Sequence, residues 1–433
     1  MTRRPFALAC ALAVSITAGA TSSASAISID CASKPDNPVG YQVSAVRADA
    51  VGIPGSAPGI AVLDTGIASV PELQGRLRAG YNVATGDQST NDIDGHGTAV
   101  ASIAAAAAGG VRGISPTSPI IPIKIFDDRG QTTPDDFVAG IERAVAANAG
   151  VINISASGAA SDVDKATARE VRNAIYAAVS LGIPVVAATG NEGASGLGIP
   201  AAYPHVIAVG ATDQNGSPAP FSNTGSGLDL VAPGSDIVTA APSVLCSSGY
   251  GSATGTSFAA PAVAGAAALL LAKHPDLDVG QLTDMLRLRG VRSPAPAWSS
   301  ELGFGPLDVA AALDAPIPSP DQPEVNDDIS WAKLQPVALA APKRSHTVFA
   351  RIAPHTDPSD VYRVKLKKGD RLNVRLQQPN GTKLKLAFGA TKLTAKRGAT
   401  FTQRVKKAGA YFVGVTIQKT PAAGSGYALT FKR

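Results

Sequence analysis

Three polar residues that could act as acid, base and nucleophile lie in short glycine-containing motifs of the chain. Asp64 ends the apolar run IAVLD, His96 stands between two glycines in DGHGTAV, and Ser257 stands in GTSFAAP. A serine hydroxyl is a weak nucleophile unless a histidine takes its proton and a buried carboxylate fixes the tautomer of that histidine. The three residues therefore predict nucleophilic acyl transfer, with carboxylate, base and nucleophile in that chain order.

Asn191 supplies a fourth group for the same chemistry. It follows the apolar run VVAATG, and its side-chain NH2 could donate to the oxyanion that forms when a hydroxyl attacks a carbonyl. Ser257 is predicted to begin a helix, so free backbone N–H groups would point toward the same oxygen. Taken alone, each residue is weak evidence. A histidine is more often a surface or core residue than a base, and a serine before a helix is most often an N-cap. Their combination is what indicates catalysis.

The DTG at Asp64 raises a second acid chemistry. These three letters also surround the catalytic residues of aspartic proteases, but that mechanism needs two carboxylates close together. The chain has no second DTG, so this alternative would require a homodimer. We therefore favour the serine nucleophile.

The elements that must position these residues alternate between strand and helix. Apolar runs typical of buried parallel strands are GIAVLD, IIPIKIF, GVINIS, IPVVAAT and HVIAVGA, and helices are predicted at residues 97–108, 134–149 and 165–182. In such sheets ligands bind beyond the carboxyl ends of the strands, where Asp64 and Asn191 are expected. The prediction is an α/β fold with a doubly wound, mostly parallel sheet.

A long apolar run follows Ser257. Its uncharged part, from Phe258 to Ala272, has 15 residues and contains Pro261. A membrane-spanning helix needs roughly 20 apolar residues, so this run predicts a buried helix of the core and no membrane span.

The first 26 residues have the pattern of a cleaved export signal. Arg3 and Arg4 precede an apolar middle and a small-residue ASA end, which predicts a mature chain that begins near Ile27. TRRPFAL fits a twin-arginine address, and an ordinary secretory signal with adjacent arginines fits equally well. Both routes imply a secreted or cell-surface bacterial protein.

Cleavage of this signal would remove Cys10 and leave Cys31 and Cys246. In an oxidising compartment these two could form one disulfide that holds the N-terminal segment, and the alternative is two unpaired buried thiols. We favour the disulfide.

The charge changes sign along the chain. Residues 1–326 carry a net charge of −11 and residues 327–433 one of +16, with a linker at 314–328 that contains four prolines and five acidic residues.

The runs after the linker alternate in period two between turn signals, which predicts a small all-β sandwich. Its charge could bind an anionic cell-wall or surface polymer, or form a solvated basic face that aids solubility. Nucleic acid is disfavoured because the protein is expected to be exported and has no recognisable binding motif.

The first part of the chain resembles the subtilisin-like serine proteases, peptidase family S8. The motifs that carry the resemblance are AVLDTGI, DGHGTAVASIAA, VINIS, VVAATGNEG, VIAVGATD, VAPGSDI and GTSFAAPAVAGAAALLL. The resemblance implies that Asp64, His96 and Ser257 are the triad and that Asn191 is the oxyanion donor. It also implies that protein or peptide substrates add as a strand between an edge at residues 128–131 and one at 155–158. Residues expected along these edges are Gly130, Ser155, Ala156 and Ser157.

These observations predict five segments. They are a signal peptide at 1–26, an N-terminal arm at 27–43, a catalytic domain at 44–313, the linker at 314–328 and a basic sandwich at 329–433. The last segment is similar to the pre-peptidase C-terminal β-sandwich domains of secreted bacterial proteases. Fold likeness alone does not establish what that domain binds.

The chain departs from the subtilisin-like pattern at several places. Relatives often have a histidine where Ala99 stands and glycines where Ser102 and Ser157 stand, and Ser157 lies beside the expected substrate pocket.

The loop AAAAAGGVRG lacks the acidic and amide residues that many relatives use for calcium, and ASVPEL keeps only Glu72 as an oxygen ligand. We expect no required cofactor and leave calcium open. The 37 residues 27–63, which precede Asp64, are too few for the inhibitory propeptide of roughly 70 residues that is common in the family.

Three functions fit these features. The first is a secreted serine endopeptidase, the second a narrow-specificity maturation protease for a partner protein, and the third a catalytically silent binding protein anchored by its basic domain. The presence of all four chemical residues disfavours the third.

Overall fold

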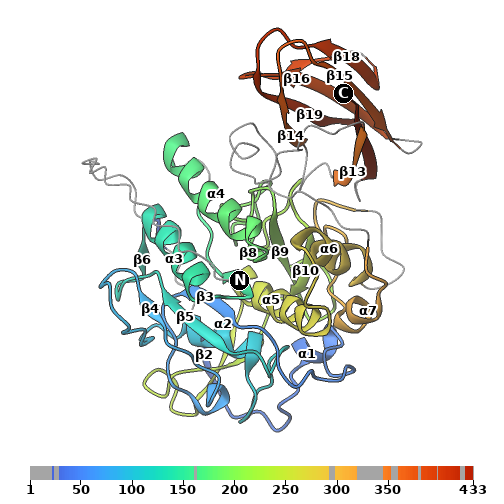
Figure 1. Ribbon diagram of the computed structural model, residues 1–433. Helices are drawn as coiled ribbons and strands as arrows, with labels where there is room; N and C mark the ends of the chain where they lie inside the picture. Colours follow the sequence, from blue (N-terminus) through green and yellow to red (C-terminus); the bar gives the residue numbers. More distant parts are fainter. Residues whose placement is uncertain are drawn as a thin grey trace.

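The computed structural model describes residues 22–23, 29–159, 163–291, 298–318, 345–352, 359–378, 382–396, 398–419 and 425–432. Most of the predicted signal peptide and most of the predicted linker lie outside these ranges. Within them, the first part of the chain alternates strands and helices and the last part contains strands (Figure 1).

A seven-stranded sheet forms the centre of the first part, and each neighbouring pair in it is parallel. The strands, in spatial order, are β10 (Leu230–Pro233), β9 (Val206–Thr212), β8 (Val185–Ala188), β7 (Val151–Ile154), β3 (Ile60–Asp64), β5 (Ile120–Lys124) and β4 (Tyr81–Asn82). Every residue of β3, β5, β7, β8, β9 and β10 is buried, as expected for a parallel sheet covered on both faces. The predicted α/β fold is confirmed.

Helices cover both faces of this sheet. They are α1 (Tyr41–Ala45), α2 (His96–Ala105), α3 (Pro134–Ala146), α4 (Lys165–Ser180), α5 (Thr256–Lys273), α6 (Val279–Asp284) and α7 (Val309–Asp314), with short helical turns at Pro71–Leu73 and Met285–Arg289. Val62 of β3 belongs to the core that contains α2 and α5, whereas Leu63 belongs to the core that contains Ile141 of α3 and Ile175 of α4. The strand thus alternates its side chains between two apolar layers.

Helix α5 is the apolar run that follows Ser257. Among the described residues it is the one helix long and apolar enough to cross a membrane, but residues 256–270 are all buried inside the protein. Gly265 lets it pack closely, because a Cβ there would lie 3.0 Å from the carbonyl oxygen of Ala104 in α2. The helix lies at the centre of the core (Figure 1), as the sequence predicts.

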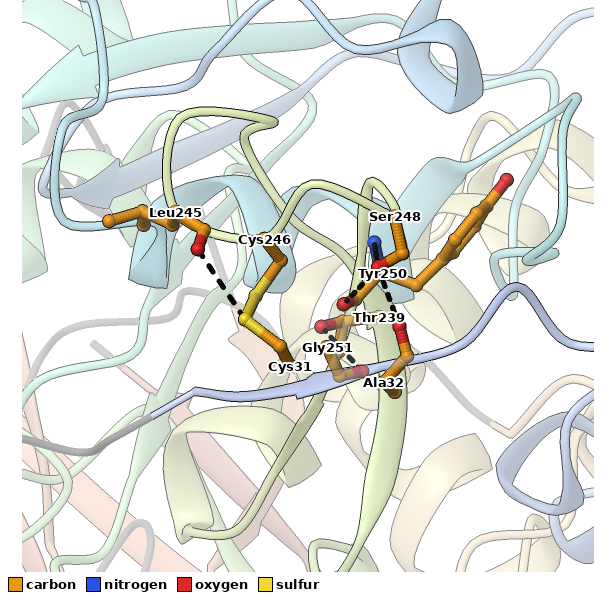
Figure 2. Close-up of a disulfide and its surroundings, with 8 residues drawn as sticks. All are labelled: Cys31, Ala32, Thr239, Leu245, Cys246, Ser248, Tyr250 and Gly251. Carbon is orange, nitrogen blue, oxygen red and sulfur yellow. Dashed lines mark hydrogen bonds between the residues drawn. A yellow bond between two sulfur atoms is a disulfide. The ribbon is translucent and has the colours of Figure 1, made fainter.

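The N-terminal arm is tied to the rest of the protein by a strand and a disulfide. Strand β2 (Asp30–Ala32) pairs antiparallel with β12 (Tyr250–Ala253), which pairs with β11 (Ile237–Ala240). Figure 2 shows the bond between Cys31 and Cys246, with Ser248 donating from its hydroxyl to the carbonyl oxygen of Ala32 at 2.5 Å. The predicted disulfide is confirmed, and the alternative of two free thiols is wrong.

The last part of the chain folds into two antiparallel four-stranded sheets. One contains β13 (Ser345–Ile352), β20 (Ser425–Lys432), β15 (Arg371–Gln377) and β18 (Thr400–Arg404), and the other β14 (Ser359–Leu366), β19 (Gly409–Lys419), β16 (Lys383–Gly389) and β17 (Thr394–Ala395). Buried side chains from both sheets, such as Val374 and Val415, share one apolar cluster. The predicted all-β architecture is confirmed.

Candidate active site

Asp64 and His96 meet at the carboxyl edge of the central sheet. Asp64 is the last residue of β3 and is completely buried, and its Oδ1 lies 2.7 Å from Nδ1 of His96, the first residue of α2. The same oxygen accepts a hydrogen bond of 2.8 Å from the backbone N–H of Thr65. The residue after the histidine must be small, because a Cβ on Gly97 would lie 2.0 Å from the carbonyl oxygen of Gly66.

The surroundings of His96 change its acidity. Burial alone lowers the pKa of this imidazole, but the charge and hydrogen bond of Asp64 raise it, as do the charges of Asp94 and Asp92, and the pKa is raised overall. Because a carboxylate can only accept, Nδ1 carries the proton toward Asp64. In the neutral ring Nε2 is then left with a lone pair and can act as a base.

Ser257 lies at the start of α5 and lines the same cleft as His96. This cleft has a volume of about 680 Å³, and Asn191 and Thr65 also line it. Ser257 is nearly buried, and the ring of the next residue, Phe258, packs against the His96 imidazole with centroids 5.2 Å apart. Because α5 begins at Thr256, Ser257 lies in the first turn of the helix, where backbone N–H groups are free to donate.

The side chain of Asn191 is oriented by the residue before Ser257. Its Oδ1 accepts hydrogen bonds from the backbone N–H of Thr256 at 2.8 Å and from the Thr256 hydroxyl at 2.9 Å. The Thr256 hydroxyl also accepts from the N–H of Gly190 at 3.2 Å. Since the amide oxygen is engaged with Thr256, the NH2 group is the end of Asn191 that remains for the cleft it lines.

The two predicted substrate edges both line the cleft. Gly130 and Thr132 contribute from one side, and the edge strand β6 (Gln131–Thr132) pairs antiparallel with β1 (Ser22–Ser23). This edge therefore accepts an added extended strand from the chain's own N-terminal region.

Ser155, Ala156 and Ser157 line the cleft along the second edge. The side chain of Ser155 is buried and donates to the carbonyl oxygen of Ser257 at 2.7 Å, while Asn153 donates to the Ser155 hydroxyl at 2.9 Å. Its hydroxyl is thus used inside the protein, and what this residue offers to a bound strand is its backbone.

Two residues that support the site were missed by the sequence interpretation. Asp92 is buried and accepts hydrogen bonds from Thr65, Gly95 and Thr98. These bonds connect the residue after Asp64 with residues on both sides of His96. Lys124 ends β5 and donates to the carbonyl oxygen of Thr65 at 2.6 Å. The acidic spacing in DIDGHG was the one signal that could have pointed to Asp92.

Glu72 was the one candidate calcium ligand. Its Oε1 accepts hydrogen bonds from the hydroxyl of Tyr250 at 2.6 Å and from the N–H of Gly110 at 3.3 Å. The Tyr250 hydroxyl and the Gly110 N–H place partly positive hydrogens against this carboxylate oxygen, and these would repel a calcium ion. The surroundings of Glu72 therefore do not fit calcium. Across the part of the chain that the structure describes, no cluster of three His, Cys, Asp or Glu side chains could hold a metal ion.

Comparison with known proteins gives consistent matches. Residues 55–305 match the subtilase family. Subtilisin BL from Lederbergia lenta is 40% identical over 254 residues, which cover 58% of this chain and 90% of that protein. A solved structure described as MycP3 protease from the type VII (ESX-3) secretion system is 26% identical with a TM-score of 0.60 and covers 69% of this chain and 95% of that one. A protease from Pseudoalteromonas arctica matches with a TM-score of 0.57 at 28% identity, over 65% of this chain and 99% of that one.

Proposed function

The chain belongs to the subtilase family of serine proteases, and on that premise we propose that Asp64, His96 and Ser257 are the catalytic triad of an exported endopeptidase. The observation that carries the proposal is the 2.7 Å contact between Asp64 Oδ1 and His96 Nδ1 in a cleft that Ser257 also lines. Substrates are proteins or peptides, and the proposed chemistry requires no cofactor.

The proposed reaction has two halves. Nε2 of His96 takes the proton of the Ser257 hydroxyl as Oγ bonds to the peptide carbonyl carbon, and the oxygen of that carbonyl becomes negatively charged. The Asn191 NH2 and a backbone N–H at the start of α5 donate to this oxygen. The C–N bond then breaks, His96 gives its proton to the leaving amine, and an acyl-enzyme remains. In the second half His96 takes a proton from water, and the water oxygen bonds to the ester carbon. The bond from that carbon to Oγ then breaks, His96 returns the proton to Ser257, and the acid is released.

Export is part of the proposal. The N-terminal pattern that ends near Ile27 supports cleavage of a signal by either the secretory or the twin-arginine route. The disulfide between Cys31 and Cys246 supports an oxidising destination outside the cytoplasm, because such bonds persist there. We therefore expect the mature protein to be secreted or attached to the cell surface.

Two other functions are separated from this one by experiment. A narrow-specificity maturation protease would share the same site, and the match to a protease from a secretion system favours this second candidate. A silent binding protein would have the fold without an activated serine. A peptide-library profile separates digestion, which gives broad cleavage, from processing, which gives narrow cleavage.

The test of the triad is labelling with a fluorophosphonate, followed by mass spectrometry of the modified peptide. The expected adduct is on Ser257, and Ser257→Ala should abolish both labelling and peptide hydrolysis while circular dichroism stays unchanged. Hydrolysis retained by the purified variant would remove Ser257 from the role of nucleophile. A folded wild-type sample without adduct would favour the silent binding protein.

A second function, binding of an anionic polymer, is favoured by one feature of the C-terminal sheets. Arg371 of β15 lies directly opposite Arg404 of β18, and Lys432 of β20 lies opposite Asn373, the next outward-facing residue of β15. Like charges on facing strands repel each other, and a polyanion such as a cell-wall polymer would relieve that repulsion. Salt-sensitive binding to anionic wall polymer should be lost in the full-length double variant Arg371→Gln/Arg404→Gln. The control Arg78→Gln/Lys165→Gln, with the same change of charge at exposed sites, should keep it, and equal binding by both variants would contradict this surface.

A further inference from the structure

One part of the cleft, which we call the side pocket, lies beside Asn191. Residues 155–158 form one wall and Asn191 and Glu192 the other, and the backbone of residues 198–199 is bonded to the segments of both walls. The N–H of Gly198 donates to the carbonyl oxygen of Thr189 at 2.9 Å, and Ile199 exchanges two backbone hydrogen bonds of 2.9 Å with Gly158. These bonds hold residues 198–199 against the segments that form the two walls.

Ser157 projects into the side pocket. Its Oγ lies 3.0 Å from the position that a Cβ on Gly190 would take, and its Cβ lies 2.9 Å from the corresponding position on Gly198. The hydroxymethyl group of Ser157 therefore lies between the two glycines and close to both backbones. On the Gly190 side Ser157 shares the space with Asn223 Nδ2 and Glu192 Oε2, which lie 2.3 and 2.7 Å from the same position, and on the Gly198 side Ser157 is the nearest group.

The geometry of the reaction directs one substrate side chain toward this space, a step that rests on the proposed function. The attacked carbonyl has its carbon at Ser257 and its oxygen at the Asn191 amide. The α-carbon on the amino side of the cleaved bond is bonded to that carbonyl carbon. Its side chain must therefore lie next to Asn191, and with the peptide strand along residues 155–157 the side pocket is the space that receives it.

We propose that Ser157 restricts the residue on the amino side of the cleaved bond to small side chains, namely glycine, alanine and serine. A leucine or phenylalanine side chain needs volume that the Ser157 hydroxymethyl group occupies. The walls cannot move apart easily, because the hydrogen bonds at Gly158, Gly198 and Ile199 hold them together. The substrate class is therefore polypeptides with a small residue before the cut.

The test uses the full-length protein and peptides that differ only at this residue, with alanine, serine, leucine or phenylalanine there. We expect kcat/KM for alanine to exceed that for phenylalanine by about tenfold or more in the wild type. In Ser157→Gly the ratio of kcat/KM for phenylalanine to kcat/KM for alanine should rise by about tenfold or more. A difference of one methylene in such a pocket changes kcat/KM by roughly 10- to 200-fold.

Two further variants serve as controls. Ser157→Ala keeps the Cβ that lies near Gly198, so it should admit phenylalanine less well than Ser157→Gly does. Ser217→Gly removes an exposed hydroxymethyl group in the turn that follows Asp213, and its cleavage profile should equal that of the wild type.

The outcomes separate this inference from the triad proposal. Fluorophosphonate labelling of Ser257 is measured on every sample, and a folded wild type that does not label contradicts the proposed function. Labelled wild type that prefers phenylalanine overturns the role of Ser157. Equal profiles for Ser157→Gly and the labelled wild type overturn it as well.

Discussion

The side-chain oxygen of Asn191 accepts two hydrogen bonds from Thr256, the residue directly before Ser257. An amide has one acceptor end and one donor end, so these bonds determine which end of Asn191 is left for the cleft. The proposed oxyanion donor and the proposed nucleophile are thereby held in a constant relation through a single residue of α5.

Replacement of Asn191 by alanine should therefore slow the chemical step. We expect kcat to fall by about 10² to 10³ with little change in KM, as loss of one oxyanion donor does elsewhere. Steady-state kinetics on a peptide substrate measures both constants, and circular dichroism controls for folding. An unchanged kcat would exclude the donor role.

Thr256→Val should have a smaller effect of the same kind. Valine keeps the shape of the side chain but removes the hydroxyl that donates to Asn191 and accepts from Gly190. Loss of such a hydrogen bond should lower kcat by about 3- to 30-fold and leave KM unchanged, because the residue positions the amide without touching substrate. Thr256→Ser keeps the hydroxyl and should retain wild-type kcat. A rise in KM with constant kcat in Thr256→Val would argue for a binding role instead.

The raised pKa of His96 predicts the acid side of the pH profile. The base must be neutral, so kcat/KM falls as the pH decreases through this pKa, and the midpoint should lie above the ordinary histidine value of about 6.5. Asp64→Asn removes the charge that raises the pKa but keeps the burial that lowers it. Its acid limb should move to lower pH, and its kcat should fall by about 10⁴. An acid limb that stays in place in Asp64→Asn would show that another group controls it.

The disulfide should contribute measurably to stability. Cys31 and Cys246 are 215 residues apart in sequence, and closing so long a loop restricts the unfolded chain strongly. Cys31→Ser should lower the free energy of unfolding by roughly 2 to 5 kcal/mol in urea denaturation. Cys246→Ser and the double variant should give the same loss, since each removes one and the same bond. A double variant clearly less stable than both single variants would indicate another role for one thiol.

Tyr250 should stabilise the protein through its hydrogen bond to Glu72, the candidate calcium ligand. Tyr250→Phe removes the hydroxyl that donates to Glu72 and accepts from Gly110, at a cost of about 1 to 3 kcal/mol. Tyr203→Phe is the matched control, because the buried Tyr203 hydroxyl meets no hydrogen-bond partner among the described residues and its loss should cost nothing. A calcium chelator should leave the melting temperature of the wild type unchanged, and a clear decrease would contradict this interpretation of Glu72.

The strands that lead to the candidate site could be predicted from the sequence. Buried parallel strands appear as short apolar runs, and their carboxyl ends share one edge, so Asp64 at the end of β3 and Asn191 after β8 were expected to lie near each other. Strands β4 and β10 of this sheet were missed, because YN and LVAP are too short to stand out as apolar runs. In the C-terminal part β13 and β17 were missed. Six runs that alternate in period two do indicate strands, and they correspond to β14, β15, β16, β18, β19 and β20; the runs are DVYRVKL, DRLNVRLQQ, KLKLAF, TFTQRV, AYFVGVTI and YALTFK.

The contacts that orient the site could not be predicted. Ser155 bonds to Ser257 over 102 residues, Asn191 to Thr256 over 65, and Tyr250 to Glu72 over 178. Such contacts depend on how the elements pack, and no local pattern of residue types signals them. Polar residues before a helix or after a strand have many local explanations, and only the three-dimensional arrangement selects among them.

The bond between Cys31 and Cys246 closes a covalent ring that contains Asp64, His96 and Asn191, while Ser257 lies 11 residues outside it. A protease is exposed to other copies of itself, and its surface loops are natural points of attack. One cut anywhere inside this ring leaves the two pieces joined through sulfur, so the nicked molecule keeps every part of its active site in one covalent unit. The same cross-link that holds the N-terminal arm therefore also protects the enzyme against fragmentation by its own activity.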